Sequence, residues 1–98
     1  MITPFEIEIA ESAEEDLESI WRYIGQSDLK AAQNFVMSLE KQILTLEQFP
    51  YQCPEIPENE ILGTHYRHLL HGSYRIIFKI KDMRVIIMRI IHGGRIFE

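Results

Sequence analysis

Basic side chains that could bind an anion gather in the last third of the sequence. They are Arg67, Arg75, Arg89, His92 and Arg95. Arginine donates paired hydrogen bonds to phosphate and carboxylate groups, so this set could hold an anionic partner or stabilise a phosphoryl transition state. A nuclease also needs a proton acceptor and a proton donor, and arginine cannot act as the base at neutral pH. That role would fall to His92, to His68 or to a tyrosine.

Other kinds of site are disfavoured by spacing and context. His65, His68 and His71 lie in a segment typical of a strand, where rises of about 3.3 Å per residue separate the outer two by roughly 20 Å and turn the middle one to the opposite face. Cys53 lies in an acidic loop without a neighbour that would activate a thiol. Gly93-Gly94 leads into no helix, unlike a phosphate-binding loop. We therefore expect no metal, no cofactor and no cysteine nucleophile.

The composition is typical of one small globular domain. The chain has 98 residues, of which 46% are hydrophobic and 26% are charged, which is enough for one core and no second one. Apolar runs are much shorter than the about 20 residues that cross a bilayer, and a single cysteine suits a reducing compartment. We expect one domain over residues 1–98, located in the cytoplasm and independent of membranes.

Charge is divided unevenly along the chain. Residues 1–62 carry three basic and thirteen acidic side chains, a net charge of −10. Residues 63–98 carry seven basic and two acidic side chains, a net charge of +5, together with all four histidines. Either an anionic partner docks on the last third of the chain, or the two parts neutralise each other across the fold.

The first part of the chain has the periodicity of a strand and then a helix. Residues 5–10 alternate between apolar and polar, which predicts a strand with one buried face. Ser12 and Glu15 have the spacing of a capping box. Apolar residues at helical spacing follow, and Gly25 is expected to end this helix.

A second helix is predicted to begin at Ser27 or Asp28, either of which can cap it, and to end before Pro50. A connection of about three residues requires the two helices to form an antiparallel hairpin. Residues 50–63 contain three prolines and no clear period, which indicates a loop that crosses the domain.

The remaining segments are rich in β-branched and aromatic residues and predict an antiparallel meander. They are residues 65–70, 74–80 and 84–91. Three-residue turns between them would place Arg67 opposite Ile77 and Arg75 opposite Arg89. The expected fold is α+β: an N-terminal strand, an antiparallel helical hairpin and a three-stranded antiparallel meander, with the helices on one face of the sheet.

This register sorts the meander side chains onto two faces. One face would form the core under the helices, with Tyr66, Leu70, Tyr74, Ile76, Phe78, Ile80, Ile86, Met88 and Ile90. The other face would carry Arg67, Leu69, Arg75, Ile77, Lys79, Val85, Ile87, Arg89 and Ile91. An open face that is both apolar and basic predicts a partner surface. Alternatively, long basic side chains cover the aliphatic ones, or the face is a homodimer contact.

Several sequence motifs together resemble a known family. The motifs are AEEDLESIWRYI at 13–24, LEQFP at 46–50, YRHLL at 66–70, SYRIIFKI at 73–80 and IIHGGR at 90–95. In this order and spacing the chain resembles, over nearly its whole length, the ParE/RelE toxin superfamily of bacterial toxin–antitoxin modules, which act in plasmid stabilisation. The first-helix and LEQFP motifs are similar to those of the ParE-like branch.

The resemblance implies different chemistry in the two branches. RelE-like members cut messenger RNA on the ribosome with basic residues on the sheet and, typically, a tyrosine near the C-terminus. ParE-like members poison DNA gyrase by trapping its cleaved DNA intermediate and are not nucleases. Members of both branches are inhibited by an antitoxin that wraps the toxin with a helix and an extended segment, so a toxin–antitoxin hetero-oligomer is expected.

The resemblance also assigns positions in this chain. Arg67 and Arg75 match the basic positions of the strands, and Arg95 matches the terminal arginine of the last motif. Phe97 stands where the RNA-cutting branch usually carries its tyrosine, and it has no proton to exchange. Together with the acidic net charge, the phenylalanine at this position favours a ParE-like inhibitor of DNA gyrase. Such an inhibitor is not an enzyme, and a cognate antitoxin is expected to neutralise it.

Two alternatives stay open at this point. One is a ribosome-dependent mRNA endoribonuclease that uses Arg67, Arg75, His92 and Arg95, and the other is a degenerate module that binds an antitoxin without toxicity. The partner-binding residues are expected to be Arg67, Leu69, Arg75, Ile77, Lys79, Val85, Ile87, Arg89, His92, Arg95 and Phe97. An antitoxin is expected to cover Leu69, Ile77, Val85 and Ile87, or to bind the acidic outer side of the helical hairpin.

Overall fold

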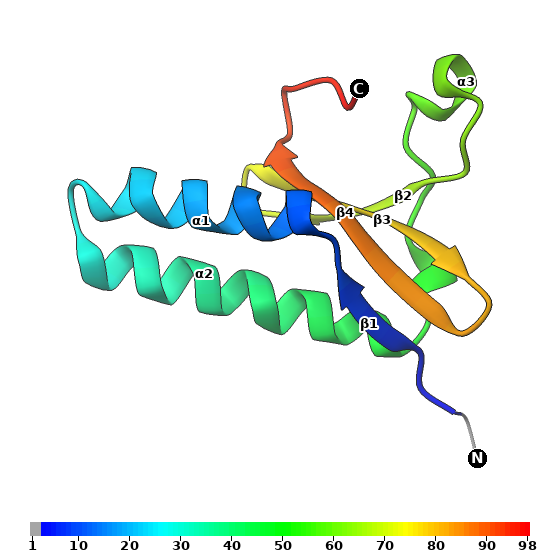
Figure 1. Ribbon diagram of the computed structural model, residues 1–98, viewed down its shortest axis with the longest axis horizontal. Coiled ribbons are helices and arrows are strands. Elements are labelled where there is room, and N and C mark those ends of the chain that lie inside the picture. The colour runs from blue at the N-terminus through cyan, green and yellow to red at the C-terminus, as the bar shows by residue number, and fades with distance from the viewer. Residues whose placement is uncertain (1–2) are drawn as a thin grey trace.

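A computed structural model describes residues 3–98 of the chain (Figure 1). The elements are β1 (Glu6–Ile9), α1 (Glu11–Gly25), α2 (Leu29–Leu44), α3 (Asn59–Leu62), β2 (Arg67–His71), β3 (Tyr74–Lys81) and β4 (Arg84–His92). The strands form one sheet in the order β1-β4-β3-β2, in which β1 runs parallel to β4 and the other neighbours are antiparallel. The helical hairpin lies against one face of this sheet (Figure 1), which confirms the expected α+β fold.

The helical hairpin lies close to its predicted position, except that α2 ends at Leu44 and a 3₁₀ turn, Thr45–Glu47, follows it before Pro50. The Asp28 side chain caps α2 by accepting a hydrogen bond from the Ala31 backbone N–H at 3.1 Å. The predicted capping box of α1 is wrong, because Ala10 is the N-cap and its side chain makes no capping bond. The Ser12 hydroxyl instead donates to the backbone oxygen of Met88 at 2.6 Å, which ties α1 to β4. Within residues 3–98, neither helix is long and apolar enough to cross a membrane.

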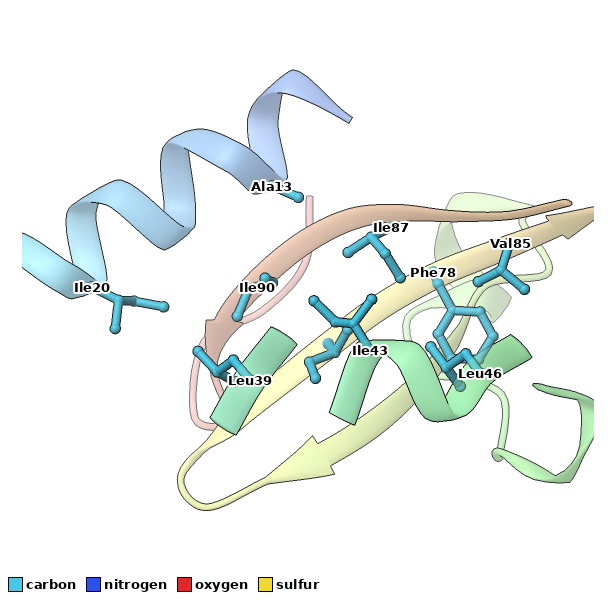
Figure 2. Packing of buried hydrophobic residues seen from close by; sticks show 10 residues of the cluster. Ala13, Ile20, Leu39, Ile43, Leu46, Phe78, Val85, Ile87 and Ile90 are labelled. Atoms are coloured by element: carbon cyan, nitrogen blue, oxygen red, sulfur yellow. The ribbon is translucent and has the colours of Figure 1, made fainter. Parts of the chain in front are cut away.

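The main core lies between the helices and the sheet. Figure 2 shows side chains from α1, α2, β3 and β4 packed together, and their cluster contains Ala13, Ile20, Leu39, Ile43, Leu46, Ile76, Phe78, Val85, Ile87 and Ile90. All of them are at most 6% exposed. Burial of this apolar surface is the main free-energy gain that holds the hairpin on the sheet.

The predicted meander register is wrong because both turns have two residues rather than three. Arg67 pairs with Phe78, and Arg75 pairs with Ile91. Each turn begins with a residue at positive φ, Gly72 at 58° and Asp82 at 57°. Two-residue hairpin turns need this left-handed backbone, which glycine adopts freely and aspartate tolerates.

A β-bulge at Met88 changes the alternation of β4. Ile77 pairs with Arg89 while the next residue, Phe78, pairs with Ile87. The extra residue lets Ile87 and Ile90 face the helices together although they are an odd number of positions apart. Bulges of this kind reset which side chains of a strand are buried.

Because of the two-residue turns and the bulge, several side chains lie on the sheet face opposite to the predicted one. Leu69, Val85 and Ile87, expected on the open face, belong to or pack against the core under the helices. Leu70, expected in the core, is 61% exposed. Tyr66, also expected in the core under the helices, packs against a different cluster on the opposite face.

Removing a core side chain of α2 should destabilise the fold far more than removing an exposed one. Leu39 is fully buried and Leu44, on the same helix, is 55% exposed. We expect Leu39→Ala to lower the free energy of unfolding by about 2–5 kcal/mol, and Leu44→Ala to change it by no more than about 0.5 kcal/mol. Urea denaturation followed by circular dichroism measures both. Equal losses in the two variants would contradict the placement of the core.

Candidate functional site

One end of the sheet face opposite the helices is covered by the chain itself. A second apolar cluster forms there from Ile56, Ile77, Ile91 and Phe97. The Phe97 ring meets the Tyr66 ring edge-on, with 5.3 Å between centroids. The segment between residues 54 and 62 and the segment 93–98 therefore close over the end of the face that was expected to be open.

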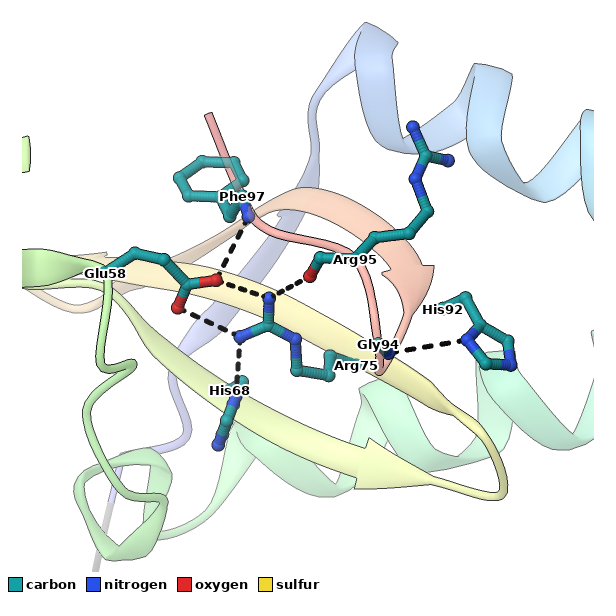
Figure 3. A network of polar contacts seen from close by, with 7 residues as sticks. All are labelled: Glu58, His68, Arg75, His92, Gly94, Arg95 and Phe97. Atoms are coloured by element: carbon teal, nitrogen blue, oxygen red, sulfur yellow. Dashed lines mark hydrogen bonds and ion pairs between the residues drawn. The ribbon is translucent and has the colours of Figure 1, made fainter.

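Arg75 lies beside this second cluster and is only 5% exposed. Its Nη2 donates to Oε2 of Glu58 at 2.6 Å, and its Nη1 donates to Oε1 at 3.2 Å. Nη2 also donates to the backbone oxygen of Arg95 at 2.7 Å (Figure 3). Burial of an unpaired cation is very costly, and this two-pronged ion pair offsets the cost. Arg75 is therefore occupied inside the chain.

Glu58 connects the loop, the sheet and the last segment. Besides the Arg75 guanidinium, its Oε2 accepts the backbone N–H of Phe97 at 3.0 Å (Figure 3). The hydrogen bonds from Arg75 lower the pKa of Glu58 to about 2, helped by the Phe97 N–H and opposed by burial. The carboxylate is thus charged at every physiological pH.

His68 lies next to this ion pair on β2. Its Nδ1 is 3.4 Å from Arg75 Nη1, and because a guanidinium only donates, Nδ1 must be the unprotonated nitrogen. Burial, and then the neighbouring Arg75 cation, lower the pKa of His68, while the Glu58 charge opposes this. His68 is therefore neutral and acts as an acceptor at neutral pH.

Two more of the predicted site residues make internal contacts. Arg67 donates from Nη1 to the backbone oxygens of Tyr51 and Cys53, and its guanidinium carbon lies 5.3 Å from the centre of the Tyr51 ring. Arg89 donates from Nε to Asp16 at 2.7 Å, and this bond raises the pKa of Arg89. Both arginines hold elements of the fold together.

His92 and Arg95 are the exposed members of the predicted basic cluster. The His92 ring meets Tyr74 edge-on at 5.7 Å, and its Nδ1 accepts the Gly94 N–H at 3.4 Å. The Arg95 guanidinium forms no ion pair with the part of the chain between residues 3 and 98. Of the five basic residues, these two are the most open to a partner.

The remaining chemistry of the chain is sparse. Among residues 3–98, no three His, Cys, Asp or Glu side chains gather where they could hold a metal ion. Burial raises the pKa of the Cys53 thiol, opposed by the nearby Arg67 charge. Sequence reasoning missed Glu58 and Asp16, the two carboxylates that engage the predicted basic residues, because neither lies near its partner in the sequence.

Comparison with known proteins identifies the family that the chain resembles. A family model described as the ParE toxin of type II toxin–antitoxin systems, parDE, matches residues 7–97. A chain from the chromosomal ParDE toxin–antitoxin system of P. aeruginosa has a TM-score of 0.71 and 20% identity, over 93% of this chain and 98% of that one. No curated protein matches significantly.

A second solved structure has the same arrangement of elements. It is a chain of the RelBE2 toxin–antitoxin complex from Mycobacterium tuberculosis, with a TM-score of 0.58 and 21% identity over 91% of this chain and 98% of that one. At these identities the two structures show a shared fold.

The charge of Glu58 should make stability depend on pH. Because the pKa of Glu58 is lower in the folded chain than its ordinary value, its contribution is fully present above about pH 4.5 and is lost as the pH falls toward 2. We expect the wild type to exceed Glu58→Gln in unfolding free energy at pH 7, and this difference to shrink between pH 5 and pH 2.

Chemical denaturation at a series of pH values measures the difference, with Glu60→Gln as a control, because Glu60 lies nearby on α3 and is exposed. A difference between the wild type and Glu58→Gln that stays constant down to pH 2 would show that the Glu58 pKa is not lowered.

Proposed function

Because the chain belongs to the ParE toxin family of type II toxin–antitoxin systems, we propose that it inhibits DNA gyrase by trapping the cleaved DNA intermediate. A cognate antitoxin neutralises it by direct binding, and both events take place in the cytoplasm. The observation that carries this proposal is the internal use of the basic residues, above all the Glu58–Arg75 ion pair.

The engagement of Arg75 and Arg67 supports a toxin that acts by binding rather than by cutting RNA. Phosphate recognition needs arginine donors that are free to meet a phosphate. The Arg75 donors Nη1 and Nη2 bond Glu58, His68 and the Arg95 backbone, and Arg67 bonds two loop carbonyls. A phosphate would have to displace the Glu58 carboxylate to reach Arg75.

Phe97 supports the same conclusion. It is 8% exposed, its ring packs in the second apolar cluster, and it carries no ionisable group. A general acid or base must exchange a proton within hydrogen-bond reach of the substrate. Phe97 therefore contributes an apolar anchor where a ribonuclease of this fold would need proton transfer.

The antitoxin contact is proposed to lie on the helical hairpin. The sheet residues expected to meet it, Leu69, Ile77, Val85 and Ile87, are in the two cores of the chain or packed against them. On α2, by contrast, Met37 is 58% and Leu44 is 55% exposed. Both line a shallow hollow together with Lys41 and Glu40. An amphipathic antitoxin segment can cover such a surface with its apolar side.

Purified protein should make DNA gyrase accumulate cleaved DNA. Gyrase, supercoiled plasmid, ATP and the toxin are incubated, then quenched with detergent and protease. We expect linear plasmid that depends on both proteins, and a quinolone serves as the positive control. Absence of linear DNA with a working control would refute gyrase poisoning, and cleavage of mRNA on programmed ribosomes would establish the RelE-like activity instead.

A charge placed on the hairpin surface should weaken antitoxin binding. Met37→Asp introduces a desolvation cost at the proposed contact, so we expect the Kd for the cognate antitoxin to rise at least about tenfold. Met83→Asp is the matched control, since Met83 is also exposed (46%) but lies at the β3–β4 turn. Isothermal titration calorimetry measures both variants. An unchanged Kd for Met37→Asp would exclude α2 as the contact.

A further inference from the structure

The segment 93–98 lies over the sheet, and Phe97 is its one buried residue. Phe97 points into the second apolar cluster, while Arg95 is exposed and Ile96 is 73% exposed. Isoleucine at this exposure next to a cation is a surface that an acidic and partly apolar partner can recognise. Together with Arg89, these two residues also line a hollow of about 420 Å³.

The path of this segment is fixed first at Gly93. The Gly93 N–H donates to the Ser73 oxygen at 2.6 Å, and a Cβ on this residue would lie only 3.2 Å from that same oxygen. Only a residue without a side chain fits this approach easily. The segment therefore leaves β4 beside the β2–β3 turn and heads back over the sheet.

Gly94 and Arg95 bond locally to His92 at the end of β4. Two further hydrogen bonds fasten the segment to elements outside β4, and both end on the same ion pair. The Phe97 N–H donates to Glu58 Oε2 at 3.0 Å, and the Arg95 oxygen accepts from Arg75 Nη2 at 2.7 Å. Figure 3 shows these two bonds on either side of the Glu58–Arg75 contact. Bonds to charged partners are roughly twice as strong as bonds between neutral groups.

We propose that Glu58 is a positioning residue for target binding: by pairing with Arg75 it holds segment 93–98 so that Arg95 and Ile96 face the target. The partner surface that fits is a carboxylate beside an apolar patch on the gyrase protein. This inference rests on the proposed function, and it gives the loop between residues 54 and 62 a role in that function.

We call the hydrogen bonds by which Glu58 and Arg75 hold segment 93–98 the latch. The latch depends on the negative charge of Glu58. A glutamine of the same size could still accept a hydrogen bond from Phe97, but it would leave the Arg75 cation buried without a counter-charge. The guanidinium would then move toward water or other acceptors and release the Arg95 oxygen. Arg95 and Ile96 would lose their fixed orientation, and partner binding would carry the cost of ordering the segment.

Limited trypsin digestion reads the latch directly at the Arg95–Ile96 bond, whose carbonyl accepts from Arg75. A protease needs an extended and undocked segment, so the cleavage rate reports how often residues 95–98 detach. We expect Glu58→Gln to raise cleavage after Arg95 at least about tenfold. Glu60→Gln, on the adjacent helix α3, should digest as the wild type does. Cleavage after Arg22, exposed on α1, serves as the internal reference for global unfolding.

Phe97→Ala is the second variant, because it removes the apolar anchor while Glu58 and Arg75 stay paired. It should also be cut faster after Arg95 with unchanged cleavage after Arg22, and it decides the outcome if Glu58→Gln unfolds globally. If the folded variants are cleaved after Arg95 at the wild-type rate, the latch is overturned, independently of the result with gyrase.

The gyrase cleavage assay then separates the latch from the proposed function. If the wild type traps cleaved DNA, Glu58→Gln should need at least about tenfold more protein for the same linear product. Full potency in a variant whose segment is released would overturn the positioning role. If the wild type itself traps nothing, the proposed function fails, while the digestion still tests the latch.

Discussion

The ion pair between Glu58 and Arg75 is the contact on which the sheet face opposite the helices depends. The two side chains come from a loop and from β3, are 12% and 6% exposed, and meet at 2.6 Å. Removing one partner of such a buried pair typically costs about 3–5 kcal/mol. Through the Phe97 N–H and the Arg95 oxygen, the pair also orders segment 93–98. Segment 93–98, which has no regular secondary structure, is thus held in one position over the second apolar cluster.

This arrangement limits what the basic residues can do in this chain. A positively charged sheet suits RNA only when its arginines are free for phosphate. Here Arg75 and Arg89 bind the carboxylates of Glu58 and Asp16, and Arg67 binds loop carbonyls. The acidic first part of the chain therefore neutralises much of the basic last part. Of the predicted basic cluster, His92 and Arg95 stay exposed, and Arg95 beside the exposed Ile96 is suited to a protein surface, as our proposal of a protein target requires.

Sequence patterns predicted the elements better than the contacts between them. Helical periodicity and the Asp28 cap located the hairpin, and β-branched runs located the strands. The predicted register is wrong because the turns at Gly72 and Asp82 have two residues, whereas the sequence pattern predicts three. A shift of one residue exchanges the two faces of a strand, so Leu69 and Val85 lie on the side opposite to the predicted one. The bulge at Met88 and the partnership of Arg75 with Glu58 depend on tertiary packing, which no local pattern in the sequence records.

The most direct test is whether the Arg75 guanidinium is bound inside the chain or free to bind phosphate. ¹⁵N NMR of the arginine side chains measures this, with an RNA oligonucleotide added in steps. An internal Arg75 should give resolved Nη–H signals that exchange slowly with water and stay in place as RNA is added, while Arg95 behaves as a solvent-exposed arginine. Arg75 signals that exchange as fast as those of Arg95, or that shift in proportion to bound RNA, would contradict an internal role. They would place this arginine in a phosphate-binding site.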